Sequence, residues 1–165
     1  MTSVDGVSPT ELRAYFALVE VGALLSHEVE QQLRDGGELT YTQFQILARL
    51  LDAPSGRLRM TDLADGVVHS RSGVTYQVGV LERAGLVARA ATPHDDRSRS
   101  VLLTDAGREL VTRVMPGHVA VVRETLLAPL SADDVAALAD LLERVRTAMR
   151  VGPPPSARRR RPDAC

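Results

Sequence analysis

Residues 57–104 carry the pattern that most constrains the fold, because two short helices are expected between short strands. Arg57–Met60 alternates polar and apolar side chains, as a short strand does. A short helix is expected from Thr61, and Ser70 is placed to cap a second helix. Two short helices joined by a tight turn form a helix-turn-helix arrangement.

A hairpin with a charged tip is expected after the second helix. Residues 86–91 and 99–103 are predicted as strands, and residues 92–98 form a polar tip between them. Residues 57–104 contain seven arginines and five carboxylates, whereas the preceding part of the chain is acidic. A locally basic segment favours a polyanionic partner. The tip arginines, Arg97 and Arg99, could enter the minor groove of a DNA duplex.

The second short helix has the two faces that a helix in a DNA groove requires. Val74, Val78 and Leu81 recur at helical spacing and are predicted to face the core. The major groove admits an α-helix, and a helix N-terminus offers free N–H groups to phosphate. Small polar and hydrogen-bonding residues occupy the N-terminal end and outer face, namely Ser70, Arg71, Ser72, Thr75, Tyr76 and Gln77.

Longer helices are expected on the N-terminal side of this segment. Ser8 opens an apolar helical pattern that Asp35-Gly36-Gly37 is expected to stop. Thr40 and Gln43 have the spacing of a capping box for the next helix. Aromatic residues make up only 3% of the chain, so the core must consist mostly of leucine, valine and alanine, which favours helix packing.

Helices are expected again after the hairpin. Thr104 opens a helix that we expect Pro116-Gly117 to interrupt with a kink. Ser131 and Asp134 are placed to cap the last helix. Residues 151–165, rich in proline and arginine, are predicted to be a disordered tail.

Catalysis, metal binding and membrane insertion are not expected. No glycine-rich loop follows a predicted strand, and the adjacent pairs Asp95-Asp96 and Asp133-Asp134 fall at turn and cap positions where solvation explains them. The four histidines lie in four different elements, so we expect neither a metal site nor a cofactor. With no long apolar run or signal peptide, a cytoplasmic location without a membrane partner is expected.

Five motifs in this order resemble those of the MarR family of winged helix-turn-helix transcriptional regulators. Each motif alone is weak, but all five occur at fitting spacing across residues 8–150. They comprise residues 39–44, the LRMTDLA motif at 58–64, the SRSGVT motif at 70–75, the LERAGLV motif at 81–87, and the DDR motif at 95–97 followed by LTDAG at 103–107.

The resemblance implies a mainly α (α+β) fold, with a winged domain and a helical dimerisation lobe formed by the N- and C-terminal helices. The implied segments are a dimerisation helix (1–37), the DNA-binding domain (38–104), two further dimerisation helices (105–150) and the tail (151–165).

The implied activity is sequence-specific binding of a homodimer to a near-palindromic operator in double-stranded DNA. Repression released by a small aromatic or phenolic ligand, bound between the lobes, is also implied. By motif position, Ser70, Ser72, Thr75 and Tyr76 would contact the major groove or its phosphates. Arg97 would enter the minor groove, held by a salt bridge from Asp95.

Two departures from the family pattern leave alternatives open. The family commonly has arginine where this chain has Tyr76, and Asp-Arg where it has Gly79-Val80. A less cationic face is compatible with a second hypothesis, a protein–protein interaction module whose DNA face is degenerate. A third hypothesis, a redox regulator acting through Cys165, rests on a single terminal thiol.

Two further side chains have two interpretations each. Arg89 can reach a phosphate or pair with a carboxylate, and His118 can line a ligand cleft or pack in the core.

Overall fold

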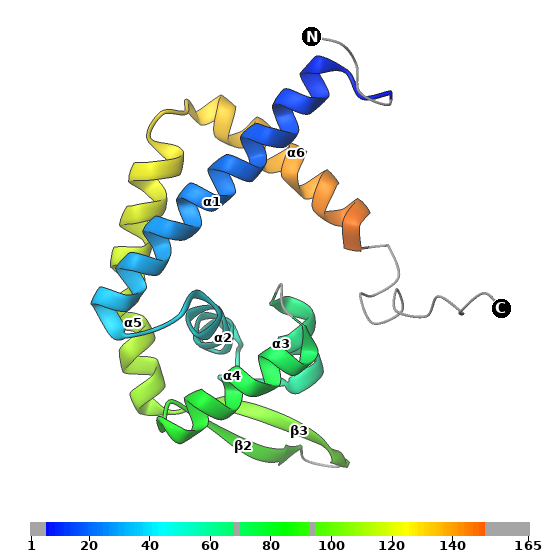
Figure 1. Ribbon diagram of the computed structural model, residues 1–165. Helices are drawn as coiled ribbons and strands as arrows, with labels where there is room; N and C mark the ends of the chain where they lie inside the picture. The colour runs from blue at the N-terminus through cyan, green and yellow to red at the C-terminus, as the bar shows by residue number, and fades with distance from the viewer. Residues whose placement is uncertain (1–5, 68–69, 93–94, 151–165) are drawn as a thin grey trace, which may run out of the picture. The chain divides into compact units, whose positions relative to one another are not determined.

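The computed structural model describes residues 6–67, 70–92 and 95–150. Helices dominate, and a small antiparallel sheet accompanies them (Figure 1). This confirms the predicted mainly α fold class. The chain divides between Thr125 and Leu126 into two compact units. The first unit contains everything from the first helix through the sheet to the following long helix, and the second contains the last helix.

Helix α1 (Pro9–Gly37) begins and ends as the sequence predicts, within a residue or two. Ser8 accepts a hydrogen bond from the N–H of Glu11, and the Glu11 carboxylate accepts one from the N–H of Ser8, which completes a capping box. The helix ends at Gly37, the last residue of the predicted stop, and the left-handed residue that follows it is Glu38, at φ 53°.

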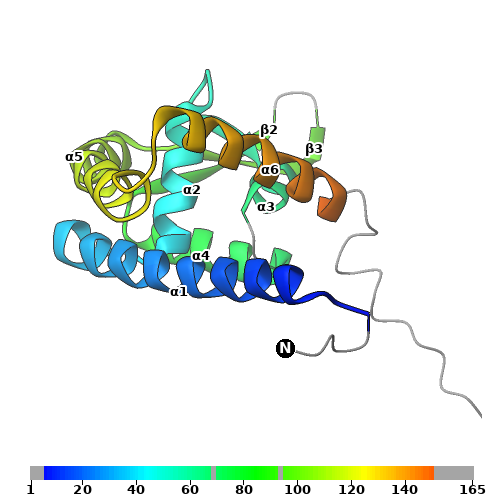
Figure 2. The same cartoon turned by 90° about the horizontal axis from the view of Figure 1, so that it is seen from above.

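Helix α2 (Tyr41–Asp52) provides the centre of the core. Thr40 and Gln43 form the predicted capping box. Ile46, Leu47 and Leu50 have no exposed surface. Burying one such side chain contributes about 1.5–3 kcal/mol. The C-terminal half of α1 packs here through Val29 and Leu33, beside α5 (Asp105–Val122), as Figure 2 also shows.

The sheet has the strand order β1-β3-β2, all antiparallel. Strand β1 (Arg57–Arg59) is shorter than predicted, because Met60 already belongs to helix α3 (Met60–Gly66). Strand β2 (Val87–Thr92) has the predicted length but lies one residue later, and strand β3 (Asp95–Leu103) begins four residues earlier than predicted. The predicted polar tip at 92–98 was therefore wrong in extent, since a strand tolerates polar side chains wherever the ladder can still pair.

Helix α5 runs through Pro116 without the predicted interruption. Pro116 lacks an N–H group, but it and Thr112, four residues earlier, are both exposed, so water can satisfy the freed carbonyl. The irregular turn lies further along, in the π-helical segment η1 (Arg123–Leu127). The second unit holds helix α6 (Ala132–Arg150). As predicted, hydrogen bonds between Ser131 and Asp134 cap the start of this helix.

Candidate nucleic-acid interface

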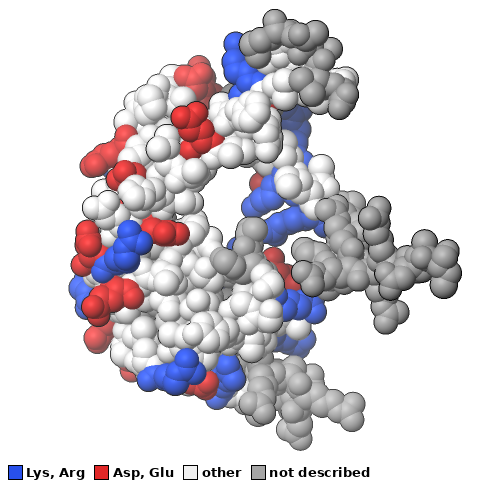
Figure 3. Space-filling view, in the orientation of Figure 1, with Lys and Arg blue, Asp and Glu red and all other residues white. Residues whose placement is uncertain are grey.

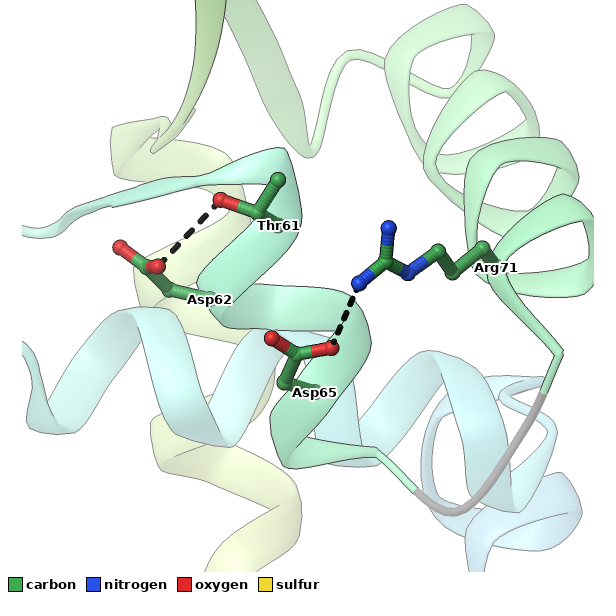
Figure 4. A network of polar contacts seen from close by, with 4 residues as sticks. All are labelled: Thr61, Asp62, Asp65 and Arg71. Carbon is green, nitrogen blue, oxygen red and sulfur yellow. Dashed lines mark hydrogen bonds and ion pairs between the residues drawn. The ribbon is translucent and has the colours of Figure 1, made fainter. Parts of the chain in front are cut away.

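Helices α3 and α4 (Arg71–Arg83) form the predicted helix-turn-helix. Ser70 caps α4 by accepting a hydrogen bond from the N–H of Gly73 at 3.1 Å. Arg71 reaches back across the turn to Asp65 of α3, at 3.4 Å between Nη2 and Oδ1 (Figure 4). Both side chains are exposed, so this pair contributes little to stability and leaves Arg71 free to exchange Asp65 for another anion.

Helix α4 divides into a buried face and an uncovered face. Val74 and Val78 have no exposed surface and Leu81 is buried with them, as predicted. On the opposite side Ser72 and Tyr76 are exposed, and Tyr76 exposes 65% of its surface. A large phenol ring that the described part of the chain leaves open is available to a partner.

Three hydroxyl groups near the start of α4 are already hydrogen-bonded within the helix. The Ser70 and Ser72 oxygens lie 3.2 Å apart. Thr75 Oγ1 donates to the carbonyl of Arg71 at 2.9 Å. The oxygens of Ser72 and Thr75 each keep an acceptor lone pair, and the Thr75 side chain stays exposed. These bonds hold the three small side chains close to the helix backbone, so they project only a short distance from α4.

Gln77 lies between helices. Its Oε1 accepts a hydrogen bond from Gln43 Nε2 at 3.1 Å, while Gln43 Oε1 accepts one from the N–H of Thr40. Gln77 thus ties α4 to the start of α2 and is half-buried. Its predicted contact with DNA stays a prediction.

The hairpin of β2 and β3 follows α4 directly. The ladder runs regularly from Val87 opposite Leu103 and then shifts register between Ala91 and Thr92. Asp95, Arg97 and Arg99 belong to β3, but their side chains lie outside what the structure describes. The predicted contacts of Asp95, Arg97 and Arg99 with each other or with DNA stay predictions.

Sequence reasoning named Arg89 but missed Arg83, and it did not predict that the two cations meet beside Gly79. Arg83, on the same helix, and Arg89, on β2, both place a guanidinium nitrogen within 4 Å of the point where a Cβ of Gly79 would lie. Arg89 also pairs with Glu82, at 3.4 Å between Nε and Oε2. The spacing Ser72–Tyr76–Gly79–Arg83 traces one helix face, and this signal could have included Arg83 in the site.

The hairpin and α5 are locked together by a short connection. Thr104 Oγ1 donates to the carbonyl of Gly85 at 2.8 Å and accepts from the N–H of Gly107 at 3.0 Å. The Thr104 N–H donates to the carbonyl of Leu86 at 3.2 Å. Gly107 is buried and packs on the Leu86 backbone. These contacts fix the position of the hairpin relative to α5 at the point where the chain passes from α4 into β2.

His118 of α5 packs against α2. Its ring lies 4.5 Å from the Phe44 ring and 6.4 Å from the Tyr41 ring, between centroids. Nδ1 is buried, and no described residue hydrogen-bonds to it. Burial lowers the pKa of His118 below its ordinary value, because the charged ring would lose its hydration. Within the described residues, then, His118 has the packing role that was one of its two interpretations.

The buried ring should make stability depend on pH. The unfolded chain binds a proton near pH 6.5, whereas the folded protein binds it only at lower pH. Stability from neutral His118 is therefore complete above that value and is lost as the pH falls from it toward the lowered pKa. We expect His118→Gln to flatten the dependence of urea midpoints between about pH 8 and pH 5. His27→Gln, at an exposed position, is the matched control; equal slopes in all three proteins would contradict the prediction.

Charge is distributed unevenly over the surface. Acidic side chains gather along the edge formed by α1 and α5, and arginines occur at the lower edge, where α4 and the hairpin lie (Figure 3). Across residues 6–67, 70–92 and 95–150, no three His, Cys, Asp or Glu side chains are grouped to hold a metal ion. Within the same residues, none of the helices has the length and apolar character needed to cross a membrane.

The geometry matches a known family of DNA-binding proteins. A family model described as the MarR family matches residues 38–98. The chain is 30% identical over 107 residues to the transcriptional repressor YetL of Bacillus subtilis, a match that covers 65% of this chain and 64% of the relative. The chain thus spans slightly less than two thirds of that relative.

Two solved structures from Streptomyces coelicolor are similar over nearly their full length. AbsC, a MarR family transcriptional regulator, superposes with a TM-score of 0.84 at 32% identity, covering 89% of this chain and 99% of that one. Sco3205, a MarR family transcriptional regulator solved in complex with DNA, gives 0.83 at 29% identity, covering 87% and 93%. All three relatives are transcriptional regulators rather than enzymes.

Proposed function

This chain belongs to the MarR family of transcriptional regulators, and from that premise we propose that it binds duplex DNA with α4 in the major groove. The observation that carries the proposal is the division of α4. Its inner face is fixed in the core by Val74 and Val78, while Ser72, Thr75 and Tyr76 stand uncovered on the other side. The proposed location is the cytoplasm, which in bacteria such as those of the relatives contains the chromosome.

The protein is proposed to act as a homodimer on a near-palindromic operator. The N-terminal half of α1 exposes apolar side chains in every direction around the helix, and a helix that is apolar all round is normally buried. Two copies would place their α4 helices about 34–36 Å apart, one turn of duplex. The uncovered residues are Tyr15, Phe16, Leu18, Val19, Val21 and Leu24.

The hairpin is proposed to act as the wing. Arg97 and Arg99 of β3 would approach the minor groove beside the α4 site, and Asp95 would hold Arg97 through a salt bridge. An arginine in that groove reads mainly its width and its negative potential.

A ligand-controlled repressor is the proposed regulatory mode. A small aromatic or phenolic molecule would favour a separation of the two α4 helices that does not fit the operator. Tyr41 and His118, both half-buried beside the buried ring of Phe44 between α2 and α5, are the aromatic side chains proposed to lie nearest to such a molecule.

Arg97→Ala is expected to weaken binding to the operator by at least about tenfold, since it removes a charged contact from each half-site. The operator is first selected by the wild-type protein from random duplex DNA, and affinity is measured by fluorescence anisotropy over a salt titration. Arg113→Ala, at an exposed position on α5, is the charge-matched control.

The same titration tests the wider proposal. Arg97→Ala binding as tightly as the wild type would remove the wing from the mechanism. A wild-type protein without affinity for any duplex would favour the interaction-module hypothesis instead.

A further inference from the structure

We infer that Gly79, Arg83 and Arg89 form a phosphate clamp at the C-terminal end of α4, which takes one DNA backbone phosphate in each half-site. The inference rests on the proposed function and assigns a role to a glycine that departs from the family pattern. The two arginines come from different elements, α4 and β2, and converge on one point.

The absence of a side chain at Gly79 leaves the point where Arg83 and Arg89 meet accessible to a ligand. An added Cβ would lie 3.6 Å from Arg83 Nη1 and 3.7 Å from Arg89 Nη2. Apart from the helix backbone and the two chain neighbours of Gly79, no other described atom lies within 4 Å of that point, so the sugar–phosphate backbone can approach the helix closely there. Two guanidinium groups facing one space suit the oxygens of a phosphate, which accept charge-assisted hydrogen bonds.

Charge at this site is left partly unbalanced. Arg89 is held by Glu82, at 3.4 Å, and its Nη2 lies 3.5 Å from the carbonyl oxygen of Thr75. Arg83 is exposed, and among the carboxylates whose side chains the structure describes, none lies within ion-pairing distance of it. Glu82 therefore orients Arg89, while the second positive charge remains available to an anion.

The position of Arg83 along α4 favours a contact with a backbone phosphate over a contact with a base edge. In helix-turn-helix proteins the N-terminal residues of the recognition helix contact base edges. Arg83 is the last residue of α4, so it would lie at the wall of the groove, where the backbone runs. A phosphate contact adds affinity on every sequence and carries none of the sequence preference.

Gly79→Ala provides the sharpest test, because folding and binding should respond in opposite directions. Alanine in a helix interior is favoured over glycine, so the melting temperature should rise by about 2–4 °C. Affinity for duplex DNA should fall by at least about tenfold, because the methyl group occupies the phosphate position. A higher melting temperature with unchanged affinity would overturn the clamp.

Arg83→Ala tests the charge. Two clamps in a dimer contact two phosphates, so the slope of log K against log salt should become shallower by about 2. Arg83→Ala should lower the affinity by the same factor for the selected operator and for random duplex DNA. Arg83→Lys should keep the slope, and Arg113→Ala, exposed on α5, should leave it unchanged.

The other outcomes separate this inference from the proposed function. A loss confined to the selected operator would mean that Arg83 reads a base, which overturns the clamp. An unchanged slope for Arg83→Ala, with a wild type that binds DNA, would reject the clamp alone. A wild type that binds no duplex would reject the proposed function and the clamp together.

Discussion

Gly107→Ala is expected to lower the free energy of unfolding by about 3 kcal/mol, the upper range for overpacking a well-packed site. A Cβ at this position would lie closer than 3.0 Å to the backbone carbonyl oxygen of Leu86 and to the Leu103 side chain. A backbone oxygen cannot rotate away. Relief requires α5 to move from the hairpin, which stretches the hydrogen bonds of Thr104 to Gly85 and Leu86.

The measurement is urea unfolding followed by circular dichroism at equal protein concentrations. Gly79→Ala is the matched control, because the same substitution there meets side-chain atoms only at ordinary contact distances, 3.6 and 3.7 Å. The two variants should shift the urea midpoint in opposite directions. If the Gly107→Ala protein were as stable as the wild type, α5 could move away from Leu86 with little loss of folding free energy, and the prediction would be wrong.

Gly107 also shows which features of the fold could be predicted from the sequence and which could not. The resemblance placed the LTDAG motif at 103–107 at the start of a helix, and the structure has α5 there. Helix caps such as Thr40 and Thr104 depend on residues three positions apart, so local spacing predicts them well. The reason for glycine lies in Leu86, which is far away in the chain, and no local pattern reports that contact.

The strand boundaries were missed for a related reason. Residues 92–98 are polar, so their composition indicated a loop, yet β2 continues to Thr92 and β3 begins at Asp95. Backbone pairing between β2 and β3 decides where these strands begin and end, and the polarity of the side chains carries little information about that pairing. The interruption expected at Pro116 failed because the freed carbonyl lies on an exposed side of α5.

The candidate site could be predicted in its pattern but not in its contacts. Helical periodicity separated Val74 and Val78 from the outer residues correctly. It could not show that Gln77 bonds to Gln43, or that Arg89 pairs with Glu82 beside Gly79, because both contacts join separate elements. Such contacts determine which of several polar side chains remain available to DNA.

The double substitution Phe16→Glu and Val19→Glu is expected to produce a folded monomer that has lost most of its operator affinity. Phe16 is 61% and Val19 52% exposed within the chain, so carboxylates there meet water in a single copy and cost little folding stability. In a dimer that covers α1, the same carboxylates would be buried without partners, which is strongly unfavourable.

Affinity should fall because dimerisation joins two half-site contacts in one molecule. Linking two contacts typically raises affinity by 10²–10⁴, so the monomer should bind a two-half-site operator about 100-fold more weakly or worse. Binding to a duplex with one half-site should stay unchanged, since α4 and its exposed face are untouched by the change.

Sedimentation at several concentrations gives the oligomeric state, and fluorescence anisotropy gives both affinities. Gln31→Glu adds a carboxylate at an exposed position of the same helix and is the control for charge. A wild-type monomer, or a double variant that remains dimeric, would contradict the interface on α1. Equal losses on the one-site and two-site duplexes would instead place the damage in the DNA-binding face, because only the loss of a partner subunit spares the single half-site.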